Sequence, residues 1–106
     1  MTAITGIVST GNNIPNGFSL KQNYPNPFNP ETTIDFSVVA NGIGKVYTSL
    51  AVYDIMGREV EKLFVGELAG GNYSMQWNAS DKPSGTYFAR LTAGENNKTI
   101  KMILTK

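Results

Sequence analysis

The chain lacks the two residue types that carry most acid–base, nucleophilic and zinc chemistry. Its 106 residues include no histidine and no cysteine, which excludes imidazole bases, thiol nucleophiles and the usual zinc ligands. Of its eight carboxylates, Glu59 and Glu61 share one face of an expected strand, but none has an apolar surround or a matched partner of the kind that catalytic pairs need. We therefore expect a protein that is not an enzyme.

Oxygen ligands for a metal ion are also few. The stretch NASDKPSG offers one carboxylate, Asp81, together with Asn78 and Ser80. Calcium takes about six to eight oxygen ligands, several of them charged in a tight site. We expect no metal and no other cofactor.

Three aromatic residues suggest a different, non-catalytic chemistry. Tyr47, Tyr53 and Phe88 fall opposite the apolar stripes of their expected strands, where exposed rings form sugar platforms in carbohydrate-binding modules of secreted enzymes. The other interpretation is that these rings pack against cross-strand neighbours. A carbohydrate-binding or spacer module is therefore the alternative to the function developed below.

The net charge and hydropathy of the chain limit the classes of partner that we expect it to bind. Nine basic and eight acidic side chains give a formal charge of +1, and the two signs are interspersed, so we expect no nucleic acid and no anionic membrane to be attracted. No run of eighteen apolar residues occurs, and the first residues have no signal-peptide pattern. We expect a soluble chain with no export signal at its own front.

Alternation of apolar and polar residues defines the elements that position these side chains. Seven segments show this period of two, each bounded by turn residues: FSLKQ, TTIDFSVV, KVYTSLAVYDI, EVEKLFV, NYSMQWN, TYFARLTA and KTIKMILTK. Hairpins are expected between residues 47–53 and 59–65 through DIMGRE, and between 87–93 and 99–105 through GENN. The pattern predicts an all-β, immunoglobulin-like antiparallel β-sandwich of about seven strands, without an intersheet disulfide.

The chain divides into a short leader and one domain. Residues 1–17 have a single small apolar cluster and a turn-forming stretch, which favours a linker or frayed segment, with docking as an extra edge strand as the alternative. Residues 18–106 form the expected sandwich domain.

A rigid segment precedes the first long strand. NYPNPFNPETT places Pro25, Pro27 and Pro30 each after an asparagine. Each proline fixes its φ, lacks an N–H donor and biases the preceding residue toward extended backbone. The segment can be neither helix nor central strand, and its role is left open by these rules.

Five segments in order resemble a known family. NYPNPFNPETTI, LAVYDIMGREVEKL, GNYSMQWN, PSGTYFARL and KTIKMILTK resemble the C-terminal sorting domain (type A) of cargo proteins of the type IX secretion system in Bacteroidetes-like bacteria. The immunoglobulin-like domain of flagellar hook-capping proteins is a related sandwich. The resemblance implies a non-catalytic secretion signal that directs an upstream cargo through the outer-membrane translocon.

Partners and location follow from the same resemblance. It implies recognition by the type IX translocon, removal by a sortase-like peptidase and covalent attachment to a preceding cargo domain. It implies transit through the periplasm to the medium or the outer-membrane surface. Cleavage is expected upstream of the proline-rich segment or within its first residues.

The family's motifs map onto individual residues of this chain. Structural roles fall on the proline-rich and turn motifs: Tyr24, Pro25, Asn26, Pro27, Phe28, Asn29, Pro30, Asp54, Gly57 and Arg58. Translocon recognition is placed on the final strands: Pro83, Gly85, Tyr87, Lys98, Lys101 and Lys106.

The last strand is expected at a sheet edge, where a partner, or a second copy in a homodimer, can add a strand. The alternative is that the edge lysines only prevent aggregation.

Overall fold

Strands make up most of the chain in the computed structural model, which describes residues 7–11, 17–40 and 44–106. There are eight strands among these residues: β1 (Ile7–Gly11), β2 (Ser19–Leu20), β3 (Glu31–Val38), β4 (Lys45–Asp54), β5 (Glu59–Ala69), β6 (Gly71–Asn78), β7 (Gly85–Ala93) and β8 (Asn96–Leu104).

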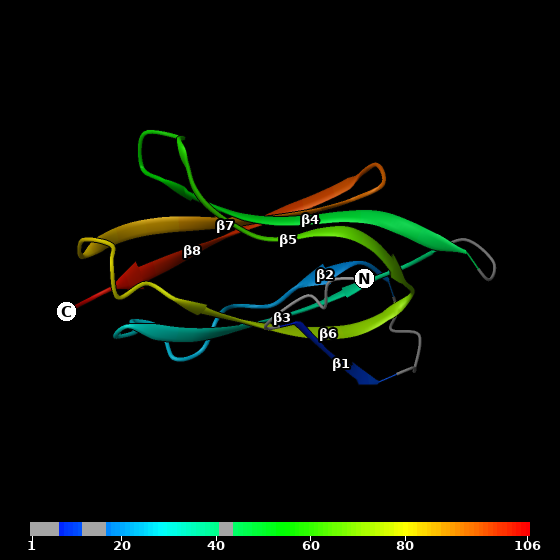
Figure 1. The fold of residues 1–106 in the computed structure, drawn as a ribbon, viewed down its shortest axis with the longest axis horizontal. Helices are drawn as coiled ribbons and strands as arrows, with labels where there is room; N and C mark the ends of the chain where they lie inside the picture. The colour runs from blue at the N-terminus through cyan, green and yellow to red at the C-terminus, as the bar shows by residue number, and fades with distance from the viewer. Residues whose placement is uncertain (1–6, 12–16, 41–43) are drawn as a thin grey trace.

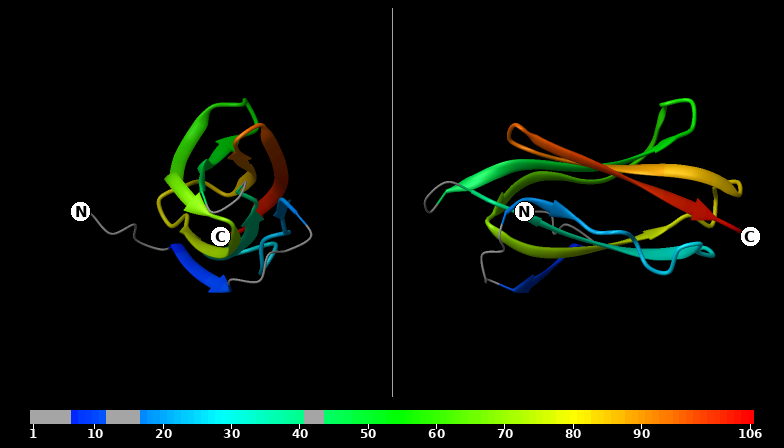
Figure 2. Two further views of the ribbon diagram at one scale, coloured as in Figure 1. Left: turned by 90° about the vertical axis from the view of Figure 1, so that its right-hand side faces the viewer. Right: turned by 180° about the vertical axis from the view of Figure 1, so that it is seen from behind.

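The strands form two four-stranded sheets that face each other across one core (Figure 1; Figure 2). One sheet has the order β1-β6-β3-β2 and the other has the order β5-β4-β7-β8, with all neighbouring strands antiparallel. The predicted antiparallel β-sandwich is confirmed. Both predicted hairpins are present as β4–β5 and β7–β8.

The eighth strand, β1, lies in the segment that the sequence favours as a linker. Residues Ile7–Gly11 pair antiparallel with β6 at the edge of its sheet, so the docked-strand alternative describes these five residues. A domain boundary at residue 18 stays a prediction.

The core follows the period of two in the strands. Inward side chains of β3, β4, β7 and β8 are almost fully buried, including Ile34, Leu50, Leu91 and Met102. Each such residue contributes about 1.5 to 3 kcal/mol on burial. At the end of the sandwich where β6 finishes and β7 begins, the Trp77 ring contacts Tyr87 edge-on at 5.5 Å between ring centroids.

The proline-rich segment closes one side of the sandwich. Phe28 is buried against Trp77, with ring centroids 5.6 Å apart, and forms an isolated parallel bridge to Leu104 at the end of β8. Figure 2 shows the segment after β2 running beside the last residues of β8. The proline-rich segment therefore joins the two sheets at one edge of the sandwich. Its prolines gave no reason to predict a strand there.

Candidate functional site

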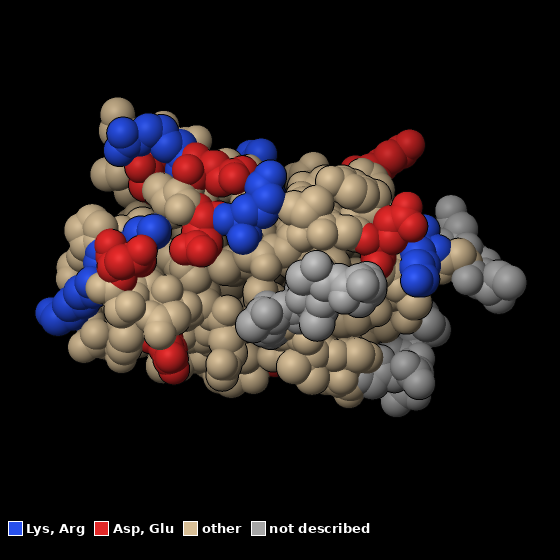
Figure 3. All heavy atoms as spheres, viewed as in Figure 1, with Lys and Arg blue, Asp and Glu red and all other residues tan. Residues whose placement is uncertain are grey.

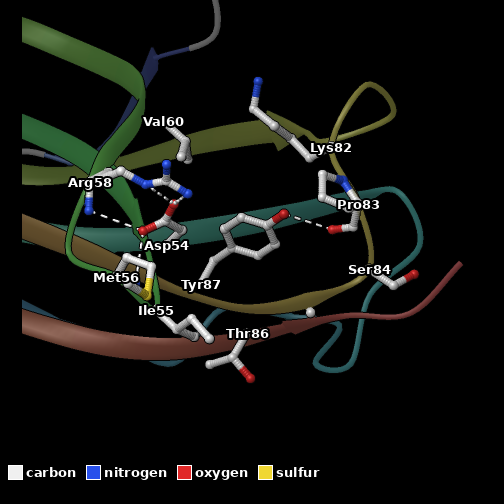
Figure 4. A pocket seen from close by; sticks show the side chains of 11 residues that line it. Asp54, Ile55, Met56, Arg58, Val60, Lys82, Pro83, Ser84, Thr86 and Tyr87 are labelled. Carbon is white, nitrogen blue, oxygen red and sulfur yellow. Dashed lines mark hydrogen bonds and ion pairs between the residues drawn. The ribbon is translucent and has the colours of Figure 1, made fainter.

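Three of the sequence motifs meet at one end of the molecule. The turn between β4 and β5, the loop before β7 and the end of β8 all lie at the left of Figure 1. Two of them, the turn at Asp54 and the loop at Pro83, line one groove of about 480 Å³ (Figure 4). We call this the hairpin-tip groove; its lining residues are Asp54, Ile55, Met56, Arg58, Val60, Lys82, Pro83, Ser84, Gly85, Thr86 and Tyr87.

One wall of the groove is a turn built around Asp54. The Asp54 carboxylate accepts hydrogen bonds from the backbone N–H of Met56 at 2.9 Å and of Arg58 at 3.0 Å. It also accepts from the Arg58 guanidinium at 2.9 and 3.0 Å. Gly57 has φ +84°, a conformation that glycine adopts without steric cost. A structural role for these three residues stays a prediction, which this geometry supports.

The same contacts set the charge state of the turn. The backbone and side-chain hydrogen bonds from Arg58, with a further bond from Met56, hold the pKa of Asp54 below its ordinary value, against a smaller effect of burial. Asp54 is therefore a carboxylate at neutral pH and keeps Arg58 paired.

The other wall is the loop that leads into β7. Tyr87 is buried, and its hydroxyl donates a 2.6 Å hydrogen bond to the Pro83 carbonyl. Figure 4 shows the Tyr87 ring between the Asp54 turn and Pro83. Burial raises the pKa of the Tyr87 phenol, so the donor is retained at neutral pH. Tyr87 therefore holds the loop before β7 in place through its bond to Pro83.

The lysines predicted for recognition do not form one site. Lys98 and Lys106 are separated by eight residues of extended chain, or about 26 Å. Lys106 joins the groove loop, since its N–H donates to Ser84 Oγ at 3.0 Å and its ammonium to the Ser80 carbonyl at 2.6 Å. Lys98 shares the inward face with Met102 but is exposed, and Lys101 lies on the outer face.

The predicted free edge of β8 is in part occupied, which corrects the expectation of strand addition beside Lys101. Gln22 Nε2 donates to the Lys101 carbonyl at 2.7 Å. Asn26 Oδ1 accepts from Ile103 N–H at 2.9 Å, and Phe28 N–H donates to the Ile103 carbonyl at 2.9 Å. The proline-rich segment supplies these partners, so a translocon strand or a second copy cannot pair there without displacing it.

Several groove residues were missed by sequence reasoning. The exposed Ile55 and Met56, with Val60, Lys82, Ser84 and Thr86, were not among the predicted site residues. A signal was present, since DIMGRE places two large apolar residues in a turn, where polar residues are usual.

The three outer aromatic residues lie on the two central strands of one sheet, β4 and β7. Tyr53 and Phe88 are paired neighbours on β4 and β7 and are half-buried, with the Arg90 guanidinium 5.4 Å from the Tyr53 ring centroid. Tyr47 lies six residues away along β4 and is 60% exposed. The register places Tyr53 beside Phe88, and the carbohydrate-binding alternative stays a prediction.

Metal-ligand clusters and membrane-spanning helices are both absent from the part of the chain that the structure describes. Residues 7–11, 17–40 and 44–106 contain no group of three or more potential metal-ligating Asp, Glu, His or Cys side chains. Within the same ranges no helix is long and apolar enough to cross a membrane. Figure 3 shows acidic and basic side chains interspersed on the face in view.

The fold is an antiparallel β-sandwich with a groove at one end, between the Asp54 turn and the loop before β7. A family model described as a secretion system C-terminal sorting domain matches residues 22–105. The chain therefore belongs to the family of type IX secretion C-terminal sorting domains.

Other comparisons concern the fold. No curated protein matches. Among solved structures, the chain is similar to the Pseudomonas fluorescens alkylpurine DNA glycosylase AlkC bound to DNA containing an abasic site analog, with 13% identity and a TM-score of 0.53. The similarity covers 84% of this chain and 30% of that chain. At this identity it shows a shared fold alone.

Family membership carries general consequences. Such domains are non-catalytic in general, are attached to a cargo domain and are recognised by the type IX secretion machinery. Membership also implies export to a surface or secreted location.

Proposed function

We propose that this chain is the C-terminal signal of a larger secreted protein, which it directs through the type IX outer-membrane translocon before a sortase-like peptidase removes it. The observation that carries the proposal is the extent of the family match. Residues 22–105 include the proline-rich segment and strands β3 to β8, so the matched unit is a folded sandwich and not a short peptide.

The fold supports a cleavage site before Phe18. From β2 onward the chain is integrated into the sheet: Leu20 is buried, and Lys21 N–H donates to the Asp35 carbonyl at 2.9 Å. A peptidase needs an extended, accessible segment, and such segments lie outside paired strands. Cleavage upstream of Phe18 would release the cargo while strands β2 to β8 stay in place.

Recognition is proposed at the end of the molecule where the motifs gather. Pro83, Gly85 and Tyr87 line the groove, and Lys106 braces its loop. For Lys98 we propose protection of the edge, because an inward-pointing charge on an edge strand discourages pairing with another chain. Lys101 lies where Gln22 already hydrogen-bonds to the edge of β8.

The test is a fusion. Residues 1–106 are attached to the C-terminus of a fluorescent protein that carries an inner-membrane signal peptide and are expressed in a bacterium with a type IX translocon. We expect fluorescence at the surface or in the medium, and periplasmic retention in a translocon-deficient strain. Periplasmic retention in both strains would refute the sorting role.

Cleavage is read from the same cells. We expect the exported reporter to lose a fragment of about the size of this domain, with a new C-terminus before Phe18. An exported reporter that keeps the intact sandwich would refute the peptidase step but leave the sorting role standing.

A further inference from the structure

Strand β6 is a long strand of this sandwich that carries no charge. Its sequence, GNYSMQWN, includes no Asp, Glu, Lys, Arg or Pro. The long edge strands of the other sheet do carry charges: Glu59, Glu61, Lys62 and Glu67 on β5, and Lys98 and Lys101 on β8. Charges and prolines are among the features that keep an exposed edge from pairing with another chain. The edge of β6 would therefore be open to pairing if nothing covered it.

Strand β1 covers this edge in the structure. It pairs antiparallel with residues 72–75 of β6 and is the outermost strand of its sheet (Figure 1). β1 is itself a poor template for a further strand, because it has only five residues and a register shift between Ser9 and Gly11 interrupts its pairing. The chain thus covers an uncharged edge with a short and irregular one.

The side chains of β1 contribute little burial. Ile7, opposite Met75, is half-buried and packs against the core. Val8, Ser9 and Thr10 are exposed, Val8 by 58%. Main-chain pairing and the covalent connection to β2, at the opposite edge of the same sheet, therefore supply much of what holds β1 in place.

The connection to β2 makes the docking of β1 intramolecular. A segment tied to its site by a short linker has an effective concentration on the order of millimolar there, and a cut removes this advantage. Cleavage upstream of Phe18 but after Gly11 would leave β1 on the cargo. A strand of five residues with one apolar side chain packed on the core would then dissociate, and residues 72–75 would lose their partner.

A second copy of β6 matches the opened edge in its pattern. Tyr73 and Met75 pack toward the core, whereas Asn72 and Ser74 alternate with them on the outer face. Two β6 strands related by a twofold axis perpendicular to the sheet run antiparallel, and both keep their apolar residues inward. Neither strand brings a charge into the contact.

We propose that β6 is a dimerisation edge that β1 conceals while the cargo is attached, and that two released domains pair through their β6 strands once β1 has been cut away. The occupant of the edge is a second copy of this chain, and the product is one sheet that continues through two sandwiches. The proposal goes beyond the sorting function and rests on its cleavage step, because a cut between β1 and β2 is what opens the edge.

The test cuts the folded chain at a chosen place. The recognition sequence of a specific protease is inserted between Gly11 and Phe18 of the 106-residue chain, which is studied by sedimentation and native mass spectrometry before and after the cut. We expect the uncut chain to be a monomer. After the cut we expect the fragment with β1 to be lost and the sedimenting mass to rise about twofold, as for a closed dimer.

Two lysine variants locate the contact. Ser74→Lys places a charge on the outer face of β6 and should keep the cut chain monomeric. Its matched control is Ser49→Lys, because Ser49 is also half-buried but lies on β4, a central strand of the other sheet. The cut control should dimerise as the parent chain does.

Two further variants test the cover without any cut. Ile7→Ser removes the apolar contact of β1 with the core and should increase self-association of the uncut chain. Val8→Ser is its matched control, because Val8 is the next residue of the same strand but is exposed, and it should leave the uncut chain monomeric. Thermal melting of each chain verifies that it is folded.

Each result decides part of the proposal. A cut chain that loses β1 and stays monomeric would overturn the dimer, and a fragment that stays bound would overturn the release of β1. Dimerisation of the cut Ser74→Lys chain would overturn β6 as the contact. If the cut chain no longer melts cooperatively, the uncut chains decide, and a monomeric Ile7→Ser chain overturns the proposal. Failure of the sorting function is read separately, in the export of the fluorescent fusion.

Discussion

Phe28 is the residue on which the closure of the sandwich depends most. Its side chain is 1% exposed and packs on Trp77. A phenylalanine side chain buries about 150 Å² or more, which at about 25 cal/mol per Å² is close to 4 kcal/mol. Phe28→Ala should therefore lower the free energy of unfolding by about 3 to 5 kcal/mol, a large part of the usual total of about 5 to 15 kcal/mol.

The measurement is urea unfolding followed by Trp77 fluorescence, with Tyr24→Ala as the control because Tyr24 is a neighbouring aromatic that is 55% exposed. We expect the control to lose less than about 1 kcal/mol. Amide exchange at Ile103 and Thr105 adds a local readout, since both N–H groups bond to the segment that Phe28 anchors. A loss for Phe28→Ala below about 1 kcal/mol would refute the anchoring role.

Further predictions concern the groove and the edge of β8. Tyr87→Phe removes the bond to the Pro83 carbonyl and should cost about 1 kcal/mol in urea unfolding; an unchanged midpoint would contradict the bracing role. Because the pKa of Asp54 is lowered by folding, its contribution to stability should be complete at neutral pH and disappear as the pH falls through the folded-state pKa. Carboxyl NMR should place that pKa below the ordinary value, and an ordinary value would refute this. Lys98→Ser should increase self-association in sedimentation, whereas Lys101→Ser should not, because the edge beside Lys101 is sealed; equal behaviour would contradict the sealed edge.

Strands such as β3 were predictable because one of their faces is buried. Ile34, Phe36 and Val38 alternate with polar neighbours, and the structure buries all three. The β4–β5 hairpin was predictable from Gly57, which can adopt the positive φ that the turn requires. Local periodicity and turn chemistry therefore determine the strands and hairpins of this fold.

The closure of β8 was not predictable from local patterns. The Asn26–Ile103 hydrogen bond joins residues 77 positions apart, and proline rules state only that the segment is extended and cannot act as a central strand. The same rules explain the result afterwards: a segment with few donors can still supply side-chain oxygens and the occasional N–H, as Asn26 and Phe28 do.

Only some residues of the candidate site were predictable, because local sequence patterns do not specify which loops come together. Pro83, Gly85 and Tyr87 were identified by motif and do line the groove. Ile55 and Met56 were not, because apolar residues in a turn carry no period that assigns them to a surface or to the core. The meeting of the two loops results from the offset between β4 and β7, which sequence patterns do not specify.

The geometry bears on what kind of signal this domain carries. The groove needs the β4–β5 turn, the loop before β7 and the brace from Lys106. The final strand is held in place by Gln22, Asn26 and Phe28 near the other end of the matched region. A hairpin of β7 and β8 alone would lack these partners, and isolated two-stranded hairpins are marginal in water. The surface proposed for recognition therefore requires the folded sandwich, and a short linear peptide of the last two strands would not present it.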